Sequence, residues 1–252
     1  MEDIFFFDSN CAIGMPMNGG MYAADAPALL AEMDYSGVEK ALVRYINTDI
    51  AIPYSNAFLA DLLKGDTQNR LTGVWTILPS QCHELPEPDE FFGAFKENRI
   101  GAITLYPVEH RYVPCRLTLG KILDAAAERK IPVLLNGFSA RWKELYDFMK
   151  EFPKLTCIYL EMYGKWGSDR NIRPLLENYE GFHFETAGYW VPEGIADLAE
   201  EYGAERILYG SHYPQYNQGN GMLQLKYSGL SADKVALIAG KNLENLLKGA
   251  QL

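Results

Sequence analysis

The chain has 252 residues, of which 48% are hydrophobic, and its formal net charge is −10. This length predicts a single domain over residues 1–252 with a substantial buried core. The acidic balance and the absence of a basic stripe exclude nucleic acid as a partner, and no apolar run is long enough to predict a membrane span. Four scattered cysteines without a CxxC pair, and no recognisable signal peptide, favour a cytoplasmic protein with reduced thiols.

Strands and helices alternate through the first half of the chain. Prolines at 79 and 107 end two of the apolar runs, which is typical of strand termini. The expected strands are 3–7, 38–46, 73–78 and 101–106, and the expected helices are 26–35, 56–64, 90–98 and 119–129.

The same alternation continues to the end. Ile195, Leu198, Ala199 and Tyr202 recur at helical spacing before Gly203, which predicts an amphipathic helix ended by a glycine. The expected strands are 131–136, 155–161, 182–186 and a last strand from 207, and the expected helices are 142–150, 172–179, 194–202, 232–238 and 243–247.

About eight strand–helix units in a chain of this length are typical of an α/β protein with a (β/α)8 TIM barrel. The alternative is a doubly wound open sheet, which usually carries a glycine-rich G-x-G-x-x-G turn after its first strand. That turn is absent from this sequence. We therefore predict a single-domain TIM barrel.

In a TIM barrel the reactive groups gather where the strands end. Alternation along a strand predicts that Asp8 and Asn10 point to one side, and that Arg44 faces the barrel interior with Leu42. The polar residues expected at strand ends are Asp8, Asn10, Arg44, Tyr106, Asn136, Glu161, Glu185 and His212.

Four segments carry a resemblance to a known family. They are residues 8–12 (DSNCA), 30–41 (LAEMDYSGVEKA), 209–214 (YGSHYP) and 240–247 (GKNLENLL). In this order they resemble the Asp-x-His-x-His start, first helix, Gly-Ser-Asp-x-Pro ending and Gly-x-Asn-x-x-x-Leu-Leu tail of the amidohydrolase-related proteins, in the branch of decarboxylases and lactonases. The resemblance covers essentially the whole chain and implies the barrel.

The same resemblance implies one divalent metal, held by two first-strand histidines, a fifth-strand histidine and the eighth-strand aspartate. Those positions hold Asn10, Ala12, Asn136 and His212 here. Amides are weak metal ligands and alanine is none, so we expect no metal and no other cofactor. The alternative is a rebuilt metal site that uses Asp8, Glu161 and His212.

His212 is the predicted catalytic residue, as a general acid or base, and Asp8 would orient it as the carboxylate does in a catalytic triad. The predicted substrate-binding residues are Asn10, Asn136, Arg44 and Tyr106, with Arg44 holding a carboxylate. Each has a plainer alternative. His212 could be a hydrogen-bonded strand-end residue, Asp8 a partner of backbone amides in its own loop, and Arg44 a surface residue.

These residues predict a metal-independent hydrolase or lactonase that acts on a small carboxylated molecule. The first alternative is an inactive pseudoenzyme that binds a small molecule. The second is a hydrolase or decarboxylase with the rebuilt metal site. The expected partner is a small-molecule ligand, and a homo-oligomer is compatible with the sequence.

Overall fold

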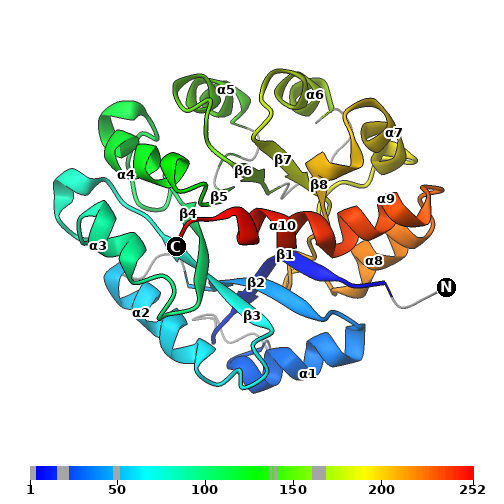
Figure 1. Ribbon diagram of the computed structural model, residues 1–252, viewed down its shortest axis with the longest axis horizontal. Helices are drawn as coiled ribbons and strands as arrows, with labels where there is room; N and C mark the ends of the chain where they lie inside the picture. The colour runs from blue at the N-terminus through cyan, green and yellow to red at the C-terminus, as the bar shows by residue number, and fades with distance from the viewer. Residues whose placement is uncertain (1–3, 16–22, 48–51, 137, 139–140, 161–168) are drawn as a thin grey trace.

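The computed structural model describes residues 4–15, 23–47, 52–136, 138, 141–160 and 169–252. Eight parallel strands pair in sequence order in one sheet. Ser9 N donates to Tyr209 O at 3.0 Å and Ala12 N to Tyr213 O at 2.9 Å, which joins the first strand to the segment after the last. Helices surround the resulting barrel (Figure 1), so the predicted (β/α)8 TIM barrel is confirmed.

The strands are short and almost wholly buried. They are β1 (Phe7–Ile13), β2 (Lys40–Tyr45), β3 (Leu71–Thr76), β4 (Ile100–Leu105), β5 (Val133–Leu135), β6 (Cys157–Tyr159), β7 (Phe182–Glu185) and β8 (Ile207–Leu208).

Most helices follow a strand along the chain, in the alternation that the sequence predicts. They are α1 (Ala26–Ser36), α2 (Ile52–Leu63), α3 (Pro88–Gly93), α4 (Arg116–Glu128), α5 (Trp142–Glu151), α6 (Asp169–Asn178), α7 (Gly194–Glu201), α8 (Gly219–Lys226), α9 (Ala232–Ala236) and α10 (Asn242–Gly249), with a π-helical stretch at Leu237–Lys241 and 3-10 turns at Ser80–Cys82 and Ala204–Arg206.

Two elements differ from the prediction. The helix α8 is absent from the predicted set, because Gly219 and Gly221 weaken its helical signal and only Gly221 and Leu225 are buried. The strand β1 spans Phe7–Ile13, whereas the apolar run that predicts it covers residues 3–7, because the polar residues that follow this run are paired and buried. Described residues include no helix long and apolar enough to cross a membrane.

The helix α10 covers the end of the barrel where the strands begin (Figure 1). Its Leu243 packs onto the apolar cluster inside the barrel. Asn242 Nδ2 donates to the carbonyls of Ala204 and Ile207 at 2.8 and 2.9 Å, just where β8 starts. The members of this inner cluster are Phe7, Leu42, Val74, Ala102, Leu134, Ile158, Leu160, Leu208 and Leu243.

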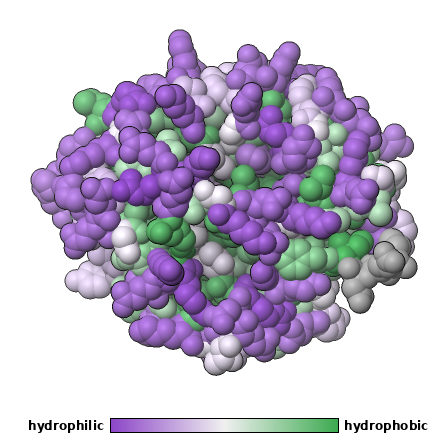
Figure 2. Space-filling view, in the orientation of Figure 1, coloured by the Kyte–Doolittle hydropathy of each residue, from purple (hydrophilic) through white to green (hydrophobic). Residues whose placement is uncertain are grey.

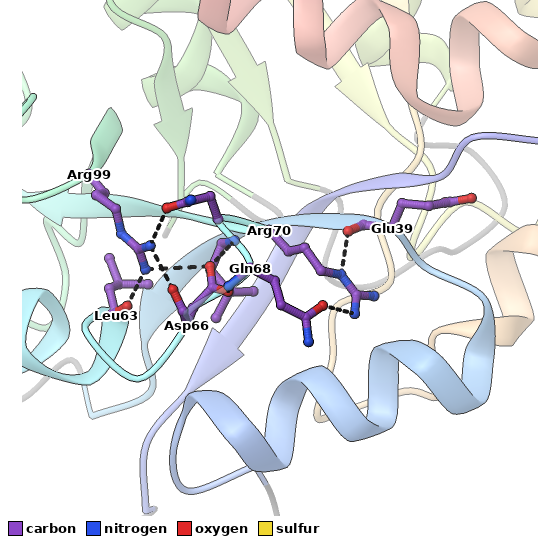
Figure 3. A network of polar contacts seen from close by, with 8 residues as sticks. Glu39, Leu63, Asp66, Gln68, Arg70 and Arg99 are labelled. Carbon is purple, nitrogen blue, oxygen red and sulfur yellow. Dashed lines mark hydrogen bonds and ion pairs between the residues drawn. The ribbon is translucent and has the colours of Figure 1, made fainter.

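Charged side chains tie together the loops at this same end (Figure 3). The buried Asp66 carboxylate accepts from the backbone N–H groups of Gln68 and Leu71 at 3.0 and 2.8 Å, and Arg99 donates to the Asp66 carbonyl at 2.9 Å. Arg70 donates to the Glu39 carbonyl at 2.8 Å. Hydrophilic side chains cover most of this face, and its hydrophobic areas are small and separate (Figure 2).

Gly181 is a position where the barrel tolerates no side chain. A Cβ there would lie 2.1 Å from the Leu155 carbonyl oxygen, which belongs to the backbone and cannot turn away. We expect Gly181→Ala to lower the free energy of unfolding by about 1–3 kcal/mol, measured by urea denaturation. Gly93→Ala is the matched control, because no atom lies within 4 Å of its added Cβ. An equal loss in both variants would contradict the steric argument.

Candidate functional site

A layer of polar side chains lies directly above the apolar cluster inside the barrel. Residues two apart on a strand share a face, so the residues that follow Leu42, Val74 and Ala102 by two positions also face the interior. These residues are Arg44, Thr76 and Thr104, and Asn136 directly follows β5; all four are less than a tenth exposed. The strand ends therefore carry a layer of polar side chains above the apolar cluster.

Arg44 is the buried cation of this layer, with a relative exposure of 8%. Its Nη2 donates to Asn10 Oδ1 at 3.4 Å, and its Nε has no hydrogen-bond partner. Within the part of the chain that the structure describes, Arg44 forms no ion pair. A buried guanidinium with unused donors is suited to an anion, most strongly to a planar carboxylate.

Glu185 holds the other side of Asn10. Asn10 Nδ2 donates to Glu185 Oε1 at 3.2 Å, and Ala187 N donates to Glu185 Oε2 at 2.7 Å. Gly210 leaves the room for this carboxylate, because a Cβ on Gly210 would lie 2.2 Å from Glu185 Oε2. Asn10 thus connects a buried carboxylate to a buried guanidinium, and the glycine of the 209–214 motif is explained by contact with Glu185.

His212 lies in the segment after β8 and is 5% exposed. Burial, and secondly the charge of Arg44, lower the pKa of its imidazole to about 4. The ring is therefore neutral at pH 7, and its Nδ1 has no hydrogen-bond partner. It meets the Tyr216 ring edge-to-face at 5.6 Å between ring centres. A neutral imidazole whose Nδ1 has no partner can accept a proton from water or a substrate.

Asp8 faces a different layer from Asn10, so the predicted shared side is wrong. The pairing of β1 with β2 shifts between Asp8 and Cys11, where two residues of β1, Ser9 and Asn10, oppose the single residue Leu42 of β2. This bulge turns Asn10 inward and leaves Asp8 beside the segment after β8.

The sequence also predicts that Asp8 orients the His212 ring, and the contacts differ. Its carboxylate accepts from Ser211 N at 2.9 Å, Ser211 Oγ at 2.5 Å, Asn10 N at 3.0 Å and Gln218 Nε2 at 3.2 Å. Burial raises the pKa of Asp8, and these hydrogen bonds oppose that rise. Asp8 therefore accepts hydrogen bonds from backbone N–H groups and from Ser211 and Gln218. This is close to the plainer alternative, in which Asp8 binds the backbone amides of its own loop.

The remaining predicted residues lie at the same end of the strands. Tyr106 directly follows β4, and its hydroxyl is buried without a hydrogen-bond partner. Asn136 is 4% exposed. Glu161 lies outside the described residues. The sequence places Glu185 at a strand end, but it was not among the predicted site residues; that position is the signal that could have identified it.

Comparison with known proteins identifies a family for this chain. Residues 83–248 match the sequence model of the family described as Amidohydrolase. No curated protein matches the sequence.

Several solved structures share the fold. An uncharacterized TIM-barrel protein from Bordetella bronchiseptica is 17% identical, with a TM-score of 0.70, over 98% of this chain and 99% of that one. 5-Carboxyvanillate decarboxylase from Sphingomonas paucimobilis is 13% identical, with a TM-score of 0.71, over 97% of this chain and 99% of that one. A dihydroxybenzoic acid decarboxylase from Polaromonas sp. JS666, with bound manganese and an inhibitor, is 15% identical, with a TM-score of 0.68, over 97% of this chain and 97% of that one.

Among the described residues, the donor set at the barrel mouth does not fit such a metal. No group of three or more His, Cys, Asp or Glu side chains in the described ranges is arranged to hold one. The inward positions on β1 carry the Asn10 amide and the Ala12 methyl, and the cation Arg44 bonds to Asn10. The predicted loss of the metal site stays a prediction, as does its rebuilding with Glu161.

The unusual acidity of His212 can be tested directly. We expect its ring to titrate near pH 4 in an NMR titration, with assignment from the His212→Gln variant, and Arg44→Gln to raise the midpoint. The folded-state pKa lies below the ordinary value near 6.5, so the unfolded chain takes up the proton first as the pH falls. The contribution of His212 to the free energy of unfolding is therefore fully present above pH 6.5 and is lost as the pH falls toward 4. A midpoint near 6.5 in the folded protein would contradict the burial argument.

Proposed function

The chain belongs to the amidohydrolase family, and from that premise we propose that it is a metal-independent hydrolase of a small carboxylated molecule, such as a lactone. Arg44 binds the carboxylate, and His212 serves as the base that activates water. Tyr106 and Asn136, which lie at the same strand ends, contact the rest of the substrate.

One observation carries this proposal: the guanidinium of Arg44 is buried without an ionic partner among the described residues. A charge removed from water is costly unless an opposite charge accompanies it. Asn10 supplies only a neutral amide at 3.4 Å and leaves Nε unused. A substrate carboxylate supplies both the missing charge and acceptors for the spare N–H groups.

His212 supplies the proton transfers of hydrolysis. Its neutral imidazole takes a proton from water as the water oxygen attacks the substrate carbonyl. When the ester carbon–oxygen bond breaks, the imidazolium returns that proton to the leaving oxygen. The unpartnered hydroxyl of Tyr106 can donate to the carbonyl oxygen as negative charge develops there.

Decarboxylation is the second candidate function. Two of the structures with the same fold are named as decarboxylases of small aromatic carboxylic acids. The same Arg44 site would hold such an acid. Binding without any reaction, as in a pseudoenzyme, would need Arg44 but not His212.

The Arg44 role predicts a specific loss of binding. We expect benzoate to bind the wild type, and Arg44→Met to weaken its affinity at least about 10-fold, because charge-assisted hydrogen bonds are lost. Isothermal titration calorimetry measures this. Arg141→Met is the matched control, since Arg141 is exposed and already paired with Glu144 at 2.6 Å. Equal affinity in the wild type and Arg44→Met would remove Arg44 from the site.

The His212 role predicts a loss of turnover that separates the three functions. We screen small lactones, acyl compounds and aromatic carboxylic acids for acid release and for carbon dioxide release. His212→Ala is expected to lower kcat by roughly 100-fold or more on the substrate that reacts. Acid release supports hydrolysis and carbon dioxide release supports decarboxylation. Binding without either product supports the pseudoenzyme, and equal rates in both proteins remove His212 from the mechanism.

Metal independence has its own measurement. We expect elemental analysis of the purified protein to find far less than one equivalent of zinc or manganese, and chelator treatment to leave benzoate affinity unchanged. A stoichiometric metal that is lost together with benzoate binding would overturn this part of the proposal and favour a rebuilt metal site.

A further inference from the structure

The segment between β8 and α8 presents His212 in an unusual backbone conformation. His212 has a φ of 55°, in the left-handed region that residues with a side chain seldom adopt. Such a conformation persists only where its surroundings hold it. The contacts around His212 show what holds it.

Asp8 fixes the residue that precedes His212. Its two carboxylate oxygens accept from the N–H and the hydroxyl of Ser211 at 2.9 and 2.5 Å. Asp8 is fully buried, so these bonds do not compete with water. Its remaining contacts, Asn10 N and Gln218 Nε2, anchor the carboxylate to β1 and to the residue before α8.

Ser211 passes this constraint to the residue that follows His212. The Ser211 hydroxyl donates its proton to Asp8 and accepts from Tyr213 N at 2.9 Å. The His212 carbonyl in turn accepts from Gln215 N at 2.9 Å. Both neighbours of His212 are therefore held by one chain of hydrogen bonds that begins at Asp8.

The far end of the segment is tied to the same carboxylate. Gln218 is fully buried directly before α8, and its carbonyl accepts from the Tyr209 hydroxyl at 2.7 Å. Its side chain donates to Asp8. The loop from residue 209 to residue 218 is thus closed on itself and fastened to β1.

We propose that Asp8 is a positioning residue for His212, acting through the backbone N–H and the hydroxyl of Ser211 and not through the imidazole. This inference deepens the proposed function, because its catalytic consequence rests on His212 as the base. The placement of the ring itself can be measured without any substrate.

The test uses two mild variants and a matched control. Asp8→Asn keeps one acceptor oxygen for the backbone N–H groups but replaces the oxygen that binds the Ser211 hydroxyl. Ser211→Ala removes the hydroxyl and with it the acceptor for Tyr213 N. The control is Asp66→Asn, which alters a buried carboxylate that also accepts two backbone N–H groups, at the opposite end of the barrel.

We expect both test variants to remain folded and to shift the NMR signals of the His212 ring, while Asp66→Asn lowers the Tm and leaves those signals in place. On a substrate found in the screen above, both variants lower kcat about 10- to 100-fold, with KM within about 2-fold because Arg44 is untouched. Unchanged His212 signals in folded Asp8→Asn and Ser211→Ala would overturn the positioning role. Shifted signals without any turnover in the wild type would support the positioning and overturn the proposed function.

Discussion

The bulge in β1 is the constraint on which the arrangement of this barrel mouth depends. One extra residue between Asp8 and Cys11 reverses the side to which each following residue points. Asp8 therefore serves the junction of β1 with the segment after β8, while Asn10, only two residues further, serves the interior. Without the bulge both polar groups would compete for one layer, and the segment that carries His212 would lose its anchor.

The interior layer depends on a sequence of contacts in which each member needs the next. Gly210 leaves room for the Glu185 carboxylate, Glu185 fixes the Asn10 amide, and Asn10 orients Arg44. The amide separates the carboxylate from the guanidinium, so Arg44 keeps unused donors. A direct ion pair would have satisfied Arg44 and removed its value for a ligand. The polar layer therefore contains a fixed anion, Glu185, and a cation, Arg44, that can still bind a ligand.

Hydrophobic periodicity predicted most of this fold because strand and helix periods are properties of local sequence. The order of the strands and nearly all the helices follow from it. The strand β1 lies almost wholly beyond its expected range 3–7, and α8 was not predicted, since Gly219 and Gly221 weaken the helical signal of a helix that tertiary contacts stabilise. The side to which Asp8 points could not be predicted, because a bulge depends on pairing with β2. Glu185 was visible at a strand end, but its importance comes from Asn10, which is 175 positions away in the sequence.

The charges at the barrel mouth also bear on a metal such as the manganese bound in the Polaromonas decarboxylase, which shares this fold. A divalent cation among the inward residues would lie near Arg44, and like charges repel strongly where burial lowers the effective dielectric constant. Histidines and carboxylates would offset that repulsion, but the inward residues of β1 are Asn10 and Ala12, and the Glu185 carboxylate already accepts from Asn10 and from the backbone of Ala187. A substrate carboxylate brings the opposite charge and is attracted to Arg44, whereas a metal ion would be repelled by it. On the proposed function, the guanidinium then provides the positive charge of the site, and His212 stays neutral because its burial, and secondly the charge of Arg44, lower the pKa of its imidazole.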